Sequence, residues 1–173
     1  MRTLVLGGAR SGKSAHAEGL VDGAGPVRYV ATARTPADDV DWVQRVAVHR
    51  SRRPTHWETV EGADLVALVS APADGVPLLV DDLGTWLTTE IDDAGAWALP
   101  RGTITPRCDA LADAVAAHTG DLVLVTPEVG LGVVPATRSG RLFRDEIGML
   151  NARLAQECDE VVLLVAGIPL RLR

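Results

Sequence analysis

The chain has 173 residues, 47% of them hydrophobic, and a formal net charge of -6 at pH 7. This length fits one domain with a full core, so we expect residues 1–173 to form one domain. The negative charge argues against a general nucleic-acid binder, because phosphate contacts require a positive surface. The apolar runs are too short to span a membrane, and glycines from Gly7 onward leave no room for a signal peptide, so we expect a cytoplasmic protein.

Apolar runs and helical patterns alternate along the chain. Strands are predicted at residues 2–6, 27–31, 57–60, 76–80, 122–126 and 161–166. Helices are predicted at residues 14–21, 38–48, 63–70, 83–91, 107–118 and 138–157, the last with Phe143, Ile147, Leu150 and Leu154 on one stripe. Residues 92–106 and 127–135 are predicted to be loops, because they contain glycine or proline without a sustained period. This alternation indicates an α/β fold, with a doubly wound, mainly parallel sheet and helices on both faces.

The first predicted strand runs into a glycine-rich segment with the pattern G-x-x-x-x-G-K-S, made of Gly7, Gly8, Ala9, Arg10, Ser11, Gly12, Lys13 and Ser14. Glycines let backbone N–H groups turn inward around an anion, and the start of the next helix adds partial positive charge. Lys13 supplies an ammonium for the outer phosphates, and the Ser14 hydroxyl is a candidate Mg²⁺ ligand. With a strand before it and a helix after it, the pattern predicts a P-loop NTPase-like nucleotide-binding domain.

Two adjacent carboxylates, Asp81 and Asp82, follow the predicted strand at 76–80. Parallel sheets present ligand-facing residues at the ends of their strands, so Asp81 is the candidate for the magnesium shell opposite Ser14. Asp82 points to the other face if the strand continues, and it suits the N-cap of the next helix.

A histidine, His49, lies within a basic segment that contains Arg45, Arg50, Arg52 and Arg53. Arginine forks match phosphate oxygens, and neighbouring positive charge lowers the pKa of a histidine toward its neutral, nucleophilic form. The residues alone leave two interpretations open, a catalytic histidine and a plain phosphate-binding patch.

The sequence resembles the bifunctional adenosylcobinamide kinase / adenosylcobinamide-phosphate guanylyltransferase family of cobalamin biosynthesis over almost its whole length. The glycine-rich segment and the segment around His49 carry part of the resemblance. The other matching segments are Tyr29-Val30-Ala31-Thr32, Arg53-Pro54 with Trp57, Thr59 and Glu61, Leu79-Val80-Asp81 with Trp86, Glu128 through Pro135, Phe143-Arg144-Asp145 with Gly148 and Asn151, and Ala166-Gly167-Ile168-Pro169.

The resemblance implies that the protein phosphorylates the aminopropanol hydroxyl of adenosylcobinamide with a nucleoside triphosphate, ATP or GTP. It then transfers GMP from GTP to that phosphate through a GMP–histidine intermediate, and His49 matches the family's histidine. The resemblance also implies guanine-nucleotide binding at Ala31, Thr32, Ala33, Arg50, Ser51, Arg52, Arg53, Glu61 and Asp81. Family members form homo-oligomers; the helix at 138–157 is a candidate interface, although an apolar stripe more often serves core packing.

Two other functions are open at this point. Another P-loop small-molecule or nucleotide kinase would use Lys13, Ser14 and Asp81 but would leave His49 and its arginines without a role. A regulatory nucleotide-binding module would bind nucleotide without turning a substrate over.

Overall fold

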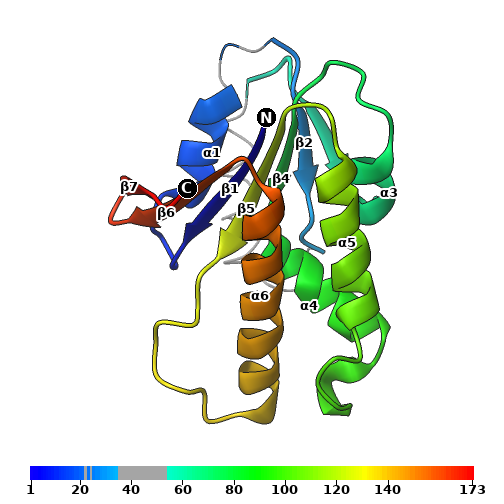
Figure 1. Cartoon of the computed structure of the whole chain (residues 1–173), viewed down its shortest axis with the longest axis vertical. Coiled ribbons are helices and arrows are strands. Elements are labelled where there is room, and N and C mark those ends of the chain that lie inside the picture. The colour runs from blue at the N-terminus through cyan, green and yellow to red at the C-terminus, as the bar shows by residue number, and fades with distance from the viewer. Residues whose placement is uncertain (22, 24, 35–53) are drawn as a thin grey trace.

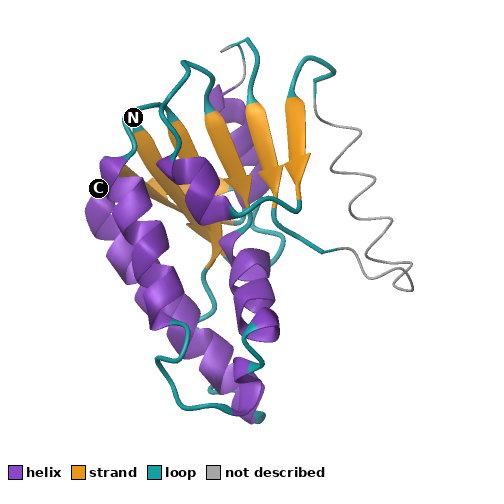
Figure 2. Ribbon diagram, turned by 90° about the vertical axis from the view of Figure 1, so that its right-hand side faces the viewer, coloured by secondary structure: helices purple, strands orange, loops and turns teal. Residues whose placement is uncertain are grey.

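The computed structural model describes residues 1–21, 23, 25–34 and 54–173. These residues form a seven-stranded sheet with the order β3-β2-β4-β5-β1-β6-β7, and every pairing is parallel except that of β6 with β7. Helices lie on both sides of the sheet (Figures 1 and 2). The predicted α/β class and mainly parallel sheet are therefore confirmed. The predicted helix at 38–48, together with His49, Arg50, Ser51, Arg52 and Arg53, lies outside the described residues.

The described elements follow the predicted alternation closely. The strands are β1 (Arg2–Gly7), β2 (Arg28–Ala31), β3 (Glu58–Glu61), β4 (Leu78–Asp81), β5 (Leu122–Pro127), β6 (Glu160–Val165) and β7 (Ile168–Arg171). The helices are α1 (Lys13–Val21), α3 (Leu65–Ser70), α4 (Leu83–Asp93), a 3-10 turn η1 (Ala96–Ala98), α5 (Thr105–Ala117) and α6 (Arg138–Glu157).

Two hydrophobic clusters cover the two faces of the sheet. Because side chains alternate along a strand, Leu4 and Leu6 of β1 face one cluster, and Val5 between them faces the other. The larger cluster packs against α3, α4, α5 and α6, whereas the smaller one packs against α1. On α6, Ile147, Leu150 and Leu154 are buried as predicted, and Phe143 is only partly buried against the same core.

Two predictions about the chain's irregular parts are wrong. Residues 92–106 are not one loop, because α4 continues to Asp93, η1 follows, and α5 begins at Thr105 with a proline in its first turn. Gly95 with its φ of +57° makes the turn between α4 and η1. The strand at 161–166 is also not the last, since a tight turn at Ala166 and Gly167 leads into the antiparallel β7.

The long loop between β5 and α6 projects beyond the sheet and returns to the start of α6 (Figure 1). None of the helices in the described part of the chain is long and apolar enough to cross a membrane.

Candidate functional site

The carboxyl ends of the parallel strands bring most of the described candidate residues to one edge of the sheet. The register pairs Gly7 of β1 with Pro127 of β5, and it pairs Ala31 of β2 with both Asp81 of β4 and Glu61 of β3. The phosphate loop, Asp81, Ala31 and Glu61 are therefore arranged along this edge, which is the expected place for a ligand in an open α/β sheet.

The phosphate loop is a tight backbone turn between β1 and α1. The Ser11 N–H donates to the Gly8 carbonyl at 3.3 Å, and Arg10 and Gly12 have φ values of +56° and +91°. A Cβ atom at position 7 would lie 2.3 Å from the Ser11 hydroxyl oxygen and 3.2 Å from the Leu164 carbonyl oxygen, so a side chain there would force its surroundings to shift. Positive φ values alternate with ordinary ones in this loop, which is the backbone pattern that turns N–H groups toward an anion.

The turn between β6 and β7 supports the phosphate loop from the side. The Gly167 N–H donates to the Ser11 carbonyl at 2.9 Å, and the Gly167 Cα would be 3.5 Å from a Cβ at position 12. Ala166 and Gly167 have φ values of +52° and +81°, so this turn also depends on the left-handed region. The segment Ala166-Gly167-Ile168-Pro169 contributes to the family resemblance, and this contact gives it a physical reason.

Lys13 and Ser14 begin α1 beneath the loop. The Lys13 ammonium has one contact with the described residues, a 3.5 Å contact with the Gly8 carbonyl, which leaves it available to phosphate. The Ser14 hydroxyl donates to Asp81 Oδ1 at 3.2 Å, and the Tyr29 hydroxyl donates to Asp81 Oδ2 at 2.5 Å. Trp57 stacks on Tyr29 with ring centroids 6.4 Å apart, which fixes the phenol beneath the carboxylate.

Ser14 and Asp81 fit a Mg²⁺ ion that is delivered with a nucleotide. No group of three or more His, Cys, Asp or Glu side chains in the described part of the chain is arranged to hold a metal ion by itself. Mg²⁺ commonly takes only one or two protein oxygens and completes its octahedron with phosphate oxygens and water. A hydroxyl and a carboxylate oxygen 3.2 Å apart at the start of a P-loop helix match that donor set.

Asp82 caps a helix, whereas the adjacent Asp81 accepts hydrogen bonds from Ser14 and Tyr29. The Asp82 carboxylate accepts a hydrogen bond from the Thr85 N–H at 2.9 Å and so caps the N-terminus of α4, as the sequence predicted. Burial raises the pKa of Asp82, and the nearby Lys13 ammonium acts against that rise. The Asp82 carbonyl accepts from Thr32 Oγ1 at 2.6 Å, so the segment after β2 is joined to the end of β4.

The remaining candidates from the sequence divide into two groups. Thr32 and Ala33 lie partly buried after β2, and Glu61 is exposed at the end of β3, two strands away from Asp81. His49 and the arginines around it are not among the described residues. The two cysteines, Cys108 and Cys158, are buried in the core, and burial raises the pKa of each thiol to about 12, so neither is a ready nucleophile.

The loop after β5 is a feature of this edge whose role the sequence did not predict. Leu131, Val133 and Val134 are 85%, 95% and 64% exposed, which is unusual for three apolar side chains in one short segment. Arg141 donates to the Pro135 and Ala136 carbonyls, and Arg144 donates to the Gly130 carbonyl at 2.6 Å.

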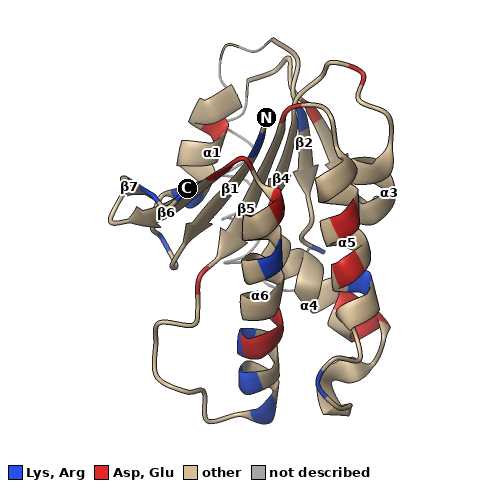
Figure 3. Ribbon diagram, viewed as in Figure 1, with Lys and Arg blue, Asp and Glu red and all other residues tan. Residues whose placement is uncertain are grey.

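Basic side chains gather on the first turns of α6 (Figure 3). The positive end of a helix dipole disfavours cations, so these arginines need another reason to be there. Hydrogen bonds to backbone carbonyls supply it, because Arg141 and Arg144 bond to the loop before α6 and Arg138 bonds to the Trp97 and Leu99 carbonyls.

Comparison with known proteins identifies the family to which this chain belongs. The model of the CobU family, cobinamide kinase / cobinamide phosphate guanyltransferase, matches residues 3–172. The bifunctional adenosylcobalamin biosynthesis protein CobP of Pseudomonas aeruginosa is 42% identical over 178 residues, which cover 100% of this chain and 98% of that protein. The protein CobU of Salmonella typhimurium, also named bifunctional, is 37% identical over 185 residues, with both chains covered completely.

A solved structure confirms the fold independently. It is a prototypical ATPase from the type III secretion system of pathogenic bacteria, which superimposes with a TM-score of 0.58 at 14% identity. The match covers 95% of this chain and 51% of the ATPase, so the chain spans about half of that protein. The phosphate loop, the strand order and the full-length family match agree, and the chain belongs to the cobinamide kinase / cobinamide phosphate guanyltransferase family of enzymes.

Proposed function

We propose that this protein phosphorylates adenosylcobinamide with a nucleoside triphosphate, ATP or GTP, and then transfers GMP from GTP to the product through a GMP–His49 intermediate. The full-length family match is the observation that carries the proposal. The arrangement of Lys13, Ser14 and Asp81 beside a phosphate loop supports it, because both steps start from a nucleoside triphosphate.

In the kinase step, the backbone N–H groups of the phosphate loop and the Lys13 ammonium orient the triphosphate and stabilise the charge that develops on it. The acceptor oxygen bonds to the γ-phosphorus, the bond from that phosphorus to the bridging oxygen breaks, and a nucleoside diphosphate leaves. A Mg²⁺ ion between Ser14 and Asp81 would neutralise phosphate charge when it is bound.

In the transferase step, a neutral His49 nitrogen bonds to the α-phosphorus of GTP, and pyrophosphate leaves with the electrons of the broken P–O bond. An oxygen of cobinamide phosphate then bonds to the same phosphorus, and the P–N bond breaks to restore the imidazole. The covalent intermediate divides one difficult transfer into two easier ones. We also propose that Arg50, Ser51, Arg52, Arg53, Ala31, Thr32, Ala33 and Glu61 bind the guanine nucleotide, and that the protein works as a homo-oligomer.

The test is covalent labelling with α-labelled GTP and Mg²⁺, followed by a denaturing gel. We expect an acid-labile, base-stable adduct, since phosphoramidates have these stabilities, and we expect it to disappear in His49→Ala. Labelling should also weaken as the pH falls below the pKa of the imidazole, because only the neutral ring is a nucleophile.

His56→Ala is a matched control, because it removes an exposed imidazole of the same region. An adduct that persists in His49→Ala would move the nucleophile elsewhere, with His16 next to be tested. A wild-type protein that phosphorylates cobinamide without labelling would be a kinase alone, and one that binds GTP without either reaction would be a regulatory module.

A further inference from the structure

Glu128 occupies the position directly beside the phosphate loop. It is the first residue after β5, the strand that lies between β1 and β4 in the sheet. Its N–H donates to the Gly7 carbonyl at 3.1 Å, which continues the β1–β5 ladder by one residue. The carboxylate of Glu128 is therefore presented at the same edge as Lys13 and Asp81.

A buried polar network fixes the end of β5 against α6. The Thr126 hydroxyl, fully buried, donates to Asn151 Oδ1 at 2.6 Å, and the Asn151 amide donates to the Pro127 carbonyl at 3.1 Å. Burying such groups in an apolar core is unfavourable unless they are paired, so these residues act here to position the backbone rather than to fill space. The backbone that they position is the one that carries Glu128.

Only one oxygen of the Glu128 carboxylate accepts a hydrogen bond from the described residues. Oε1 accepts from the Gly130 N–H at 2.6 Å, and a Cβ at position 130 would lie 2.8 Å from that oxygen, so a larger residue there would make the carboxylate shift. Oε2 has no hydrogen-bond partner in the described part of the chain. By contrast, both oxygens of Asp81 accept hydrogen bonds, and Asp82 caps α4.

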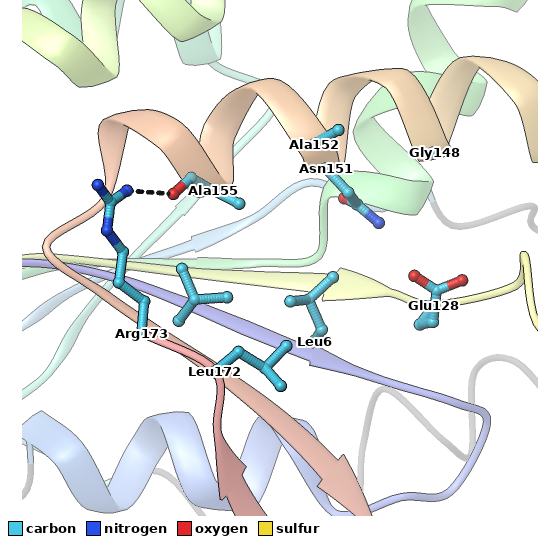
Figure 4. Close-up of a pocket in the computed structure, with 9 residues that line it drawn as sticks. Leu6, Glu128, Gly148, Asn151, Ala152, Ala155, Leu172 and Arg173 are labelled. Carbon is cyan, nitrogen blue, oxygen red and sulfur yellow. Dashed lines mark hydrogen bonds between the residues drawn. The ribbon is translucent and has the colours of Figure 1, made fainter.

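Glu128 also stands at the end of a hollow on the α6 side of the sheet. The hollow has a volume of about 350 Å³, and apolar atoms of Leu6, Ala152 and Leu172 contribute to its lining. Figure 4 shows the Glu128 carboxylate extending from the end of β5 toward α6, with Asn151 nearby. The other face of the sheet is occupied by α1, which follows the phosphate loop. Because α1 covers the other face and Glu128 lines a hollow on this one, we expect an acceptor molecule to approach from the α6 side.

From these observations we propose that Glu128 is the catalytic residue that takes the proton of the acceptor hydroxyl in the kinase step. This inference rests on the proposed function. As the alcohol oxygen bonds to the γ-phosphorus, the hydroxyl proton passes to Glu128 Oε2, and the nucleoside diphosphate leaves with the electrons of the broken P–O bond. The proton later returns to solvent.

This role distinguishes the two activities of the protein. An alcohol must lose a proton as it attacks phosphorus, whereas a phosphate monoester has a second pKa of about 6 and is already ionised near neutral pH. A base at position 128 is therefore needed for phosphorylation and not for the guanylyl transfer that follows.

The experiment compares Glu128→Gln with the wild-type protein in two separate assays. The first measures phosphorylation of cobinamide, and the second measures guanylyl transfer to cobinamide phosphate that is supplied ready-made. Glutamine keeps an oxygen that accepts from the Gly130 N–H, so the loop is preserved while the base is lost. We expect kcat of the kinase assay to fall by about 100-fold, with little change in KM for the nucleotide. We expect the transferase rate to change by less than about threefold, because its acceptor needs no base.

Glu157→Gln, at the far end of α6, is the matched control and should behave as the wild type in both assays.

Three outcomes would overturn the inference. Unchanged kinase turnover in Glu128→Gln would overturn it alone. Equal losses in both assays, with weaker GTP binding, would assign Glu128 to the support of the phosphate loop. A wild-type protein that phosphorylates no cobinamide would overturn the proposed function and this inference together.

Discussion

The two edges of the sheet use their charged residues in opposite ways. At the amino ends of the strands, charges are paired with one another: Arg2 with Asp159 at 2.8 Å, Arg28 with Glu58 and Asp74, and the terminal amine of Met1 with Asp121. At the carboxyl ends, the ammonium of Lys13 and the carboxylate of Glu128 form no ion pair in the described part of the chain. The first edge uses its charges to hold the fold together, and the second leaves the charges of Lys13 and Glu128 available for a ligand.

The same contrast extends to apolar residues. The central strands β1, β4 and β5 are buried along most of their length, whereas Leu131, Val133 and Val134 extend into solvent beyond the carboxyl edge. Exposed apolar side chains next to uncommitted charges suit a large substrate that has both apolar faces and a reactive polar group. Substitutions at the carboxyl edge should therefore change activity more than stability, and substitutions at the amino edge should do the reverse.

The largest effect is expected from Lys13→Ala. The proposed function uses one triphosphate site for both reactions, so the rates of phosphorylation and of guanylyl transfer should each fall by about 100-fold or more. The midpoint of thermal unfolding should hardly change, because the ammonium makes only the 3.5 Å contact with the Gly8 carbonyl. GTP binding and turnover measured on the same preparation are the check; unchanged values for both would remove Lys13 from the site.

The next largest effect is expected from Asp81, and it should distinguish this carboxylate from the adjacent Asp82. Asp81→Asn and Asp82→Asn each remove one negative charge, but only Asp81 accepts from Ser14. We expect Asp81→Asn to raise the Mg²⁺ concentration needed for half-maximal activity by roughly 10- to 100-fold. Asp82→Asn should be mild, since asparagine is also a good N-cap, while Asp82→Ala should lower the free energy of unfolding by about 1 kcal/mol. Titration of activity with Mg²⁺ and urea unfolding measure the two effects.

A control and a contrary result complete this comparison. Tyr29→Phe keeps the Asp81 carboxylate and removes only its phenol partner, so it should raise the Mg²⁺ requirement less than Asp81→Asn does if the carboxylate itself holds the ion. The opposite ranking of the two asparagine variants would show that Asp82 is the magnesium ligand.

Local patterns were sufficient to predict the regular parts of the fold. The glycine-rich segment after β1, the apolar runs and the 20-residue helix α6 each depend on residues close together in sequence, and their approximate positions are confirmed. The N-cap role of Asp82 also followed from local chemistry, because an acidic residue preceded a helical pattern. The binding and catalytic roles assigned to His49, Lys13 and Asp81 stay predictions.

What the sequence did not predict depends on contacts between distant segments. Gly167 supports the phosphate loop across more than 150 positions of sequence, and Asn151 positions the end of β5 from within α6. The short strand β7 was missed because its four residues carry too little periodicity to be recognised before a partner strand is known. Glu128 was noticed only as part of a matching segment, since its place beside Gly7 follows from the pairing of β1 with β5.

The smallest effect is expected at the amino edge, from Asp159→Asn. Hydrogen bonds from the Arg2 side chain and from the Arg2 N–H lower the pKa of Asp159 to about 2, from an ordinary value of 3.8. A carboxyl group whose pKa is lower in the folded state stabilises the fold fully above the unfolded-state value, and this contribution disappears as the pH falls through the folded-state value. The wild-type protein should therefore unfold at a slightly higher urea concentration than Asp159→Asn at pH 7, and the difference should shrink as the pH is lowered from about 4 toward 2.

The kinase and transferase rates of Asp159→Asn should stay unchanged, because the Arg2–Asp159 pair lies at the edge opposite the phosphate loop. A difference between wild type and Asp159→Asn that is the same at pH 7 and at pH 3 would show that the Arg2 contacts stabilise the fold without acting through the charge of the carboxylate.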